Sequence, residues 1–270
     1  MGLRVMQVSR QLGLASALAL CALLSGADAS ISEMRATVAT QAPEPEFRLA
    51  RLAYNGNNFD GFDRFGRTSW TTDAPDAEYH LSQGIRRLSR INTIDPDRDE
   101  VVLPVQPLDK ELLRYPFLYA VEVGRWYLDD QEAAAMREYL LRGGFLMVDD
   151  FHGSAQWQGF MESMQRIFPD REVVEIPDDH EVFHVLYDLD QKTQIPGVAA
   201  LRSGSTYEQD GYDPHWRGVF DDDGRLMVAI NFNMDLGDAW EHADDPGYPQ
   251  PLTALAYRFA IGYALYSMTH

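Results

Sequence analysis

A chain of 270 residues is long enough for one large or two small domains, and it can bury roughly 70% of its unfolded surface without disulfides or metals. Its hydrophobic content of 45% and charged content of 24% exclude a coiled coil, a collagen-like chain and a largely disordered one. With 23 basic and 42 acidic residues the net charge is −19, which repels nucleic acid and anionic lipid. Cations and neutral polar ligands are therefore the partners that the charge favours.

Residues 1–29 have the pattern of a secretory signal peptide. Arg4 and Arg10 precede an apolar run from Leu12 to Gly26, and Ala27-Asp28-Ala29 fits a cleavage site. The run is short for a membrane span, so an uncleaved N-terminal anchor is the alternative. Cleavage removes Cys21, the only cysteine, which suits an oxidising bacterial envelope. We therefore expect a periplasmic or secreted bacterial protein with no transmembrane domain after cleavage.

The mature chain alternates between patterns typical of strands and of helices. Residues 30–46 are rich in small and polar residues and predict a flexible leader, followed by a single domain over residues 47–270. Asp73 is the expected N-cap of a helix that runs to about residue 90. The expected strands are 47–54, 101–103, 117–121, 145–148, 172–176 and 224–230, and further helices are expected over 129–142, 155–168 and the C-terminal segment. This alternation predicts an α/β domain with a doubly wound, mainly parallel sheet.

Several separated motifs resemble the bacterial domain-of-unknown-function family 4159. They are Trp70-Thr71-Thr72-Asp73-Ala74-Pro75, Tyr115-Pro116-Phe117-Leu118-Tyr119, Gly143 to Phe151, Asp235 to Glu241, and the closing Tyr266-Ser267-Met268-Thr269-His270. The resemblance covers about residue 47 to the C-terminus. It implies a class I glutamine amidotransferase-like fold, which is a flavodoxin-type sandwich.

The chain departs from those amidotransferases at the nucleophile. Their cysteine lies on a sharp strand-to-helix turn, whereas the comparable exit here reads Asp149-Asp150-Phe151-His152-Gly153, which excludes glutaminase chemistry. The trehalose-utilisation branch of that superfamily also lacks the cysteine and carries a histidine just after the strand, which His152 resembles. This likeness is one of fold and does not identify a substrate.

Asp149, Asp150 and His152 are the candidate catalytic residues. In open α/β sheets ligands bind outside the carboxyl ends of the strands, which is where these residues follow a buried strand. Two carboxylates and an imidazole can coordinate a divalent cation or act as acid and base. The structural alternative is an N-cap with a buried salt bridge, and Arg51 on the first strand is a candidate partner for Asp149 or Asp150.

A second polar group follows the strand expected at 224–230. It contains the candidate ligand-binding residues Asn233, Asp235, Asp238 and Trp240. Amides, carboxylates and a tryptophan are the groups with which proteins bind saccharides. Asn55, in the turn after the first strand, is expected at the same sheet edge. The alternative for Asp235 and Asp238 is a solvated helix start, and Trp157 is expected to serve packing rather than binding.

The segment His180-Glu181-Val182-Phe183-His184 matches the H-E-x-x-H pattern of zinc metalloproteases, which makes His180 and His184 candidate metal ligands. No third histidine follows at the expected spacing, and Pro177 and Pro196 bound the segment closely. A structural pair of histidines is the favoured interpretation.

The leading hypothesis is an exported cell-envelope protein that binds a small polar ligand, either a glycan or a cation, or an envelope protein, at the carboxyl edge of the sheet. The alternative is a glycan-directed hydrolase or isomerase that uses Asp149, Asp150 and His152, and the cofactor expected for it is a divalent cation. A zinc metalloprotease through the histidine segment is the third. The sequence does not decide whether the protein is an enzyme.

Overall fold

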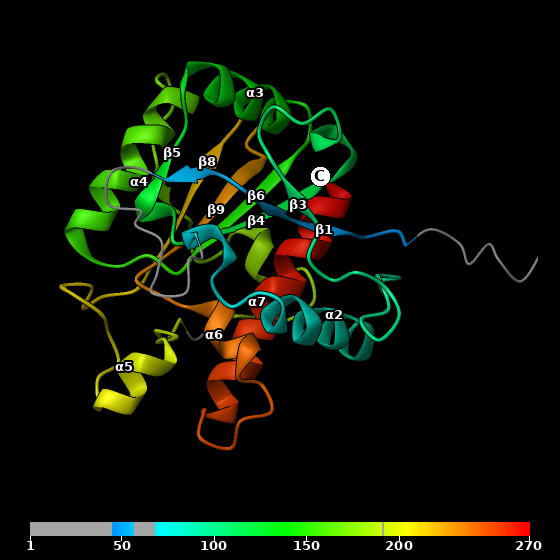
Figure 1. The fold of residues 1–270 in the computed structure, drawn as a ribbon, viewed down its shortest axis with the longest axis vertical. Coiled ribbons are helices and arrows are strands. Elements are labelled where there is room, and N and C mark those ends of the chain that lie inside the picture. The colour runs from blue at the N-terminus through cyan, green and yellow to red at the C-terminus, as the bar shows by residue number, and fades with distance from the viewer. Residues whose placement is uncertain (1–44, 57–67, 191) are drawn as a thin grey trace, which may run out of the picture. The chain divides into compact units, whose positions relative to one another are not determined.

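The computed structural model describes residues 45–56, 68–190 and 192–270, and every structural statement below concerns these residues. The predicted signal peptide, and all but the last two residues of the predicted leader, lie outside them. Seven strands form one mixed sheet in the order β3-β1-β4-β6-β9-β8-β7 (Figure 1). The strands are β1 (Leu49–Leu52), β3 (Pro104–Val105), β4 (Phe117–Val121), β6 (Phe145–Asp149), β7 (Val174–Glu175), β8 (His215–Phe220) and β9 (Leu226–Phe232).

The sheet is mostly parallel. All pairings from β3 to β9 are parallel, whereas β8 pairs antiparallel with both β9 and β7. A separate two-stranded sheet joins β2 (Asn55–Gly56) to β5 (Trp126–Tyr127). The carboxyl ends of β1, β4, β6 and β9 therefore meet at one edge of the main sheet.

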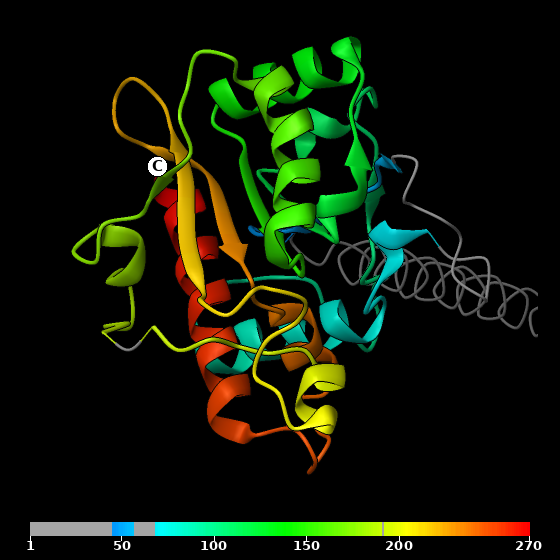
Figure 2. The same ribbon diagram turned by 90° about the vertical axis from the view of Figure 1, so that its left-hand side faces the viewer.

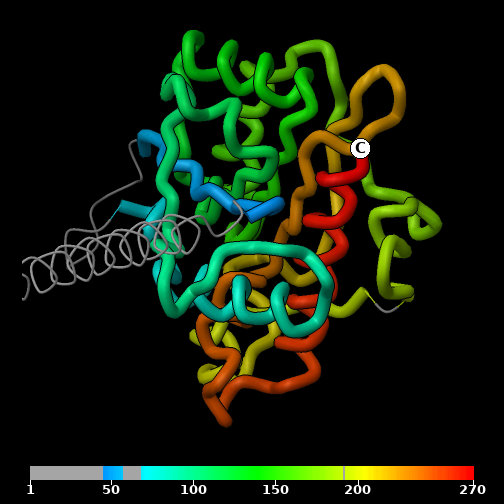
Figure 3. Tube along the Cα trace, turned by 90° about the vertical axis from the view of Figure 1, so that its right-hand side faces the viewer, coloured from blue at the N-terminus to red at the C-terminus, as the bar shows by residue number. Residues whose placement is uncertain are grey.

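Helices cover both faces of this sheet. The helices are α2 (Asp76–Leu88), α3 (Asp130–Leu141), α4 (Gly153–Ile167), α5 (Val198–Ser203), α6 (Leu236–Glu241) and α7 (Gln250–Thr269), with short 3-10 helices η1 (Ser69–Thr71), η2 (Leu112–Arg114), η3 (Val123–Arg125) and η4 (Glu181–Phe183). Figure 2 shows α3 and α4 on one side of the strands and α7 on the other. Figure 3 shows α2 beside α7, where the Tyr257 hydroxyl donates to the carbonyl of His80 over 3.2 Å.

Two hydrophobic cores follow from this layering. In β4, Phe117, Tyr119 and Val121 belong to the core under α2, α6 and α7, whereas Leu118 and Ala120 belong to the core under α3 and α4. Because both faces are covered, successive residues of the strand are all buried, which explains the unbroken apolar runs in the sequence. None of the helices in the described ranges is long and apolar enough to cross a membrane.

The predicted α/β domain with a mainly parallel sheet is confirmed, and several elements match closely. The strand over 117–121 has the predicted bounds. Helix α3 begins with the predicted capping box, in which Asp129 Oδ1 accepts from the amides of Gln131 and Glu132 over 2.8 and 2.9 Å, and Glu132 Oε2 accepts from the amide of Asp129.

Other predictions about local structure were wrong. Asp73 is not the N-cap of α2, because the cap is Pro75 and Asp73 has a left-handed φ of 63°. The strand expected at 101–103 lies instead at 104–105, and β8 was not predicted. The proposed partner of Arg51 was also wrong, because its guanidinium forms a buried ion pair with Glu78 of α2.

Candidate functional site

Five non-glycine residues of the described ranges have a left-handed backbone, and all gather around the carboxyl edge of the parallel strands. Their φ angles run from 51° to 63°, a conformation that is rare for L-residues and clusters at functional sites. Glu122 follows β4, Asp150 follows β6 and Asn233 follows β9. The other two are Asp73 and Gln209. This edge is also where open α/β sheets bind ligands, so it is the candidate site.

Asp150 and His152 form a buried pair in the turn between β6 and α4. Asp150 Oδ1 lies 3.3 Å from His152 Nε2, and the two residues are 8% and 3% exposed. The other ring nitrogen of His152, Nδ1, has no hydrogen-bond partner among the described residues. A carboxylate and imidazole in this arrangement can pass a proton to or from a bound molecule.

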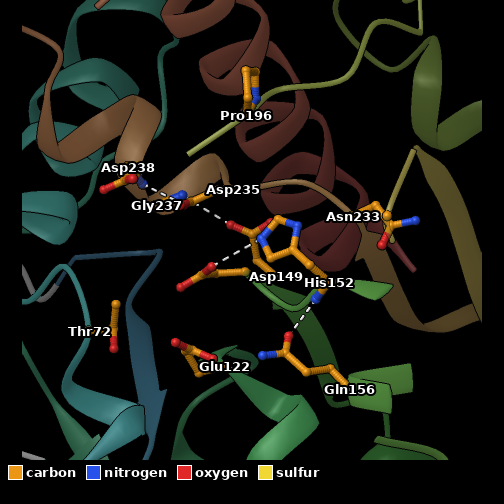
Figure 4. Close-up of polar contacts among 12 residues, drawn as sticks. Thr72, Glu122, Asp149, His152, Gln156, Pro196, Asn233, Asp235, Gly237 and Asp238 are labelled. Atoms are coloured by element: carbon orange, nitrogen blue, oxygen red, sulfur yellow. Dashed lines mark hydrogen bonds and ion pairs between the residues drawn. The ribbon is translucent and has the colours of Figure 1, made fainter. Parts of the chain in front are cut away.

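Asp149 contacts a different part of the structure from Asp150 and His152. Its Oδ2 accepts hydrogen bonds from the backbone amides of Leu236 and Gly237, over 2.7 and 3.0 Å, at the start of α6 (Figure 4). The residue is fully buried, and its Oδ1 has no partner in the described part of the chain. The predicted trio therefore divides: Asp149 fixes α6 against the sheet, whereas Asp150 and His152 face each other.

Asp235 and Asp238 belong to the start of α6. Asp235 caps the helix by accepting from the amide of Asp238 over 2.7 Å, and Asp238 Oδ2 accepts from the amide of Val198 over 2.6 Å. With Asp73 they form a group whose ligand atoms all lie within 4.8 Å of one another. A second group of this kind contains Asp238, Glu241 and His242. Among the described residues these are the groups that could hold a metal ion.

Burial and mutual repulsion both raise the pKa of the central carboxyls. Desolvation is the largest cause for Asp73, Asp149 and Asp235, and the negative charge of Asp150 is the next for each of them. The pKa of Glu208 is raised by burial as well, although the nearby His152 opposes this. The surroundings therefore disfavour the ionised forms of these carboxyls.

Two members of this group were not singled out from the sequence. The sequence around Asp73 indicates a helix cap, and Glu208 lies in an irregular loop before β8. Neither follows a buried strand, so no pattern placed them at the sheet edge. Their proximity to Asp150 arises from the tertiary fold alone.

Two predicted ligand-binding residues are engaged in contacts within the fold. The side-chain amide of Asn55, on β2, donates to Glu132 over 2.9 Å and is not part of this group. Trp240 is fully buried and packs against Tyr119, with ring centroids 5.5 Å apart, so its ring has no exposed face for a ligand.

The histidine segment does not form the α-helix that a zinc protease requires. His180 caps η4 by accepting from the amide of Val182 over 3.2 Å. Both ring nitrogens of His184 are engaged, Nδ1 with Asp188 and Nε2 with the carbonyl of Asp178, each over 3.0 Å. Neither histidine belongs to the metal-ligating groups found among the described residues.

Asn233 joins the candidate site to a neighbouring pocket. Its Oδ1 accepts from the amide of Gly153 over 2.9 Å, and its Nδ2 donates to the carbonyl of Asp213 over 2.7 Å. A cavity of about 310 Å³ lies on this side. Its walls consist of Gly153, Ser154, Trp157, Asp210, Tyr212, Asp213, His215, Arg217, Phe232 and Asn233. His152 directly precedes this wall.

The fold and the site define an α/β protein with a carboxylate-rich centre at the carboxyl edge of its parallel strands. The family described as Domain of unknown function (DUF4159) matches residues 48–268, and the chain belongs to this family. The resemblance predicted from the sequence motifs is thereby confirmed. No match was found among curated proteins.

Proposed function

We propose that this protein binds a neutral saccharide in the pocket beside Asn233. The observation that carries the proposal is a 310 Å³ cavity that combines exposed aromatic surface with fixed polar groups at the carboxyl edge of the sheet. Saccharides present both an apolar ring face and several hydroxyls, and these two features match the two kinds of wall.

The aromatic wall contains a tyrosine that is held in place although it is exposed. Tyr212 is 62% exposed, and the ring of Tyr207 packs edge-on against it with centroids 4.7 Å apart. Trp157 packs on Phe232, with centroids 4.7 Å apart, and is half-buried at the pocket. A fixed aromatic surface binds a sugar ring with little loss of side-chain entropy.

The basic groups of the pocket wall are paired with an acidic residue beside the pocket. Arg217 Nε and His215 Nδ1 both contact Glu175 Oε1, over 2.7 and 2.8 Å. Asp210 accepts from both the amide and the hydroxyl of Ser154, over 2.8 and 2.7 Å. Because the basic groups are paired and the carboxylates can accept from hydroxyls, the pocket favours a neutral ligand with hydroxyl groups over an anion.

The proposal predicts saturable changes in tryptophan fluorescence when maltotriose or chitotriose is titrated into the protein, because Trp157 lines the pocket. Replacing Tyr212 with alanine is expected to weaken binding by about two- to tenfold, since a lost aromatic contact costs about 0.5–1.5 kcal/mol.

Tyr127→Ala is the matched control, because Tyr127 is also exposed but lies on β5, outside the pocket wall. If wild type binds neither trisaccharide at about 10 mM, well above the usual range for specific ligands, the proposal is overturned. Equal binding by wild type and Tyr212→Ala would also contradict it.

A glycan hydrolase is the second candidate, and the strained Asp150 favours it. A left-handed acidic residue paired with a buried imidazole, one residue before the pocket wall, is an arrangement suited to general acid–base catalysis. Release of new reducing ends from the same trisaccharides would be the assay. Asp150→Asn and His152→Gln are each expected to slow it by about 10²–10⁴-fold, and a wild-type protein without release would exclude this candidate.

We further propose that the sheet belongs to the class I glutamine amidotransferase-like type and that the protein is exported to the periplasm or secreted. The parallel order β3-β1-β4-β6-β9 supports the first. The charged, apolar and small-residue pattern of residues 1–29 supports the second. An envelope protein as partner is the alternative to a saccharide.

A further inference from the structure

The glycine at position 197 leaves a space that three carboxylates surround. A Cβ atom built on Gly197 would lie 2.7 Å from Glu208 Oε1, 2.8 Å from Asp235 Oδ2 and 3.2 Å from Asp238 Oδ2. The φ of Gly197 is −62°, which any residue adopts, so the backbone does not require glycine here. The requirement is space, and that space is lined by carboxylate oxygens.

Asp73 supplies an independent sign that a ligand is bound here. One of its oxygens lies within 4.8 Å of ligand atoms of both Asp235 and Asp238. Its Oδ2 is buried and has no hydrogen-bond partner among the described residues. The glycine at position 237 leaves space for this oxygen, because a Cβ atom built on Gly237 would lie 2.2 Å from Asp73 Oδ2. A buried carboxylate oxygen without a donor is costly unless the carboxyl is protonated or a cation approaches it.

No lysine or arginine of the described ranges neutralises this group, and its basic neighbour is His242, whose Nε2 lies 3.7 Å from Asp238 Oδ1. No lysine or arginine there forms an ion pair with Asp73, Asp235 or Asp238. Arg51 is the basic residue that acts on Asp73, but its hydrogen bonds go to Glu78 and to the carbonyls of Trp70 and Thr72. A proton or a bound cation is therefore needed to balance the ionised carboxylates that these side chains leave unpaired.

We propose that Asp73, Asp235 and Asp238, with Glu208 beside them, form a binding site for a hard divalent cation of the Ca²⁺, Mg²⁺ or Mn²⁺ class. Carboxylate oxygens are the ligands that these ions prefer, and the site offers oxygens from separate segments of the chain. The site goes beyond the proposed saccharide pocket and does not depend on it. A protein that binds the cation but no saccharide would leave this inference standing.

The test is direct titration of the EDTA-treated full chain with Mn²⁺. Electron paramagnetic resonance measures the free ion, and calorimetry measures the heat of binding. Wild type is expected to bind Mn²⁺ with a dissociation constant of about 1 mM or tighter, as extracellular carboxylate sites do. Ca²⁺ and Mg²⁺ are then tested as competitors.

Three variants are designed to remove the site and preserve the fold. Gly197→Ala places a methyl group in the space between the carboxylates. Asp235→Asn retains an oxygen that can cap α6, and Asp73→Asn replaces a carboxyl whose Oδ2 has no partner in the described structure. Each is expected to weaken Mn²⁺ binding at least about tenfold. Asp223→Asn, in the exposed turn between β8 and β9, removes the same charge and should change nothing.

Absence of Mn²⁺ binding by wild type at about 10 mM would overturn the inference, because that concentration exceeds the affinity of even weak extracellular sites. Binding by Asp235→Asn and Asp73→Asn that equals wild type would overturn it equally. Circular dichroism of each variant shows which of them remain folded, and any one folded variant suffices for the comparison.

Discussion

Replacing Arg51 with methionine is expected to lower the free energy of unfolding by about 3–5 kcal/mol, because it leaves the Glu78 carboxylate buried without its partner. Arg51 is fully buried in β1, and its guanidinium also donates to the carbonyls of Trp70 and Thr72 over 3.0 and 2.8 Å. These contacts hold the segment that leads to Asp73. Urea unfolding followed by circular dichroism measures the effect.

Two controls separate a lost charge partner from lost packing. In the double variant Arg51→Met with Glu78→Leu no unpaired charge remains, so we expect most of the stability to return. Arg142→Met removes an exposed pair with Glu138, in which the side chains are 63% and 59% exposed, and should cost only about 0–1 kcal/mol. A loss below about 1 kcal/mol for Arg51→Met would contradict the role given to this ion pair.

Asp149 is expected to tolerate asparagine far better than alanine. Alanine leaves the amides of Leu236 and Gly237 buried without an acceptor, which costs about 1–3 kcal/mol for each. Asparagine retains one oxygen that can accept from these amides and avoids the burial of a charge. We therefore expect Asp149→Ala to lose about 2–6 kcal/mol in urea unfolding and Asp149→Asn to remain close to wild type.

The same pair of variants has a pH signature. Burial, and then the charge of Asp150, raise the pKa of Asp149 well above its usual 3.8. A carboxyl whose pKa is higher in the folded state contributes stability that is complete below the unfolded pKa and is lost as the pH rises through the folded pKa. The melting temperature, measured in EDTA, should therefore fall further for wild type than for Asp149→Asn between about pH 5 and pH 8. A steeper loss for Asp149→Asn would contradict this explanation.

Those parts of the fold that depend on local chemistry were predictable. The apolar runs of β4 and β6 are bounded by turn residues, and the capping box of α3 needs only Asp129 and Glu132. Strand β8 was missed because Arg217 and Gly218 interrupt its pattern, and its pairing with β9 lies beyond local sequence. Asp73 was misread because a cap and a left-handed turn both favour aspartate.

The site could be predicted only where it follows from topology. Asp149 ends β6, Asp150 follows it, and Asn233 and Asp235 follow β9. The two strands are parallel neighbours, so strand order alone places these residues at one edge. Glu208 and Asp73 come from connections whose course no periodicity encodes. The choice of Glu78 rather than Asp149 as the partner of Arg51 likewise depends on where α2 packs.

The most direct test of the carboxylate centre is anomalous diffraction from crystals soaked in Mn²⁺. We expect a peak in contact with oxygens of Asp73, Asp235 and Asp238, in the space beside Gly197. A map with no peak at this edge, and Mn²⁺ only on exposed carboxylates such as Asp222, would show that the group does not bind a divalent cation.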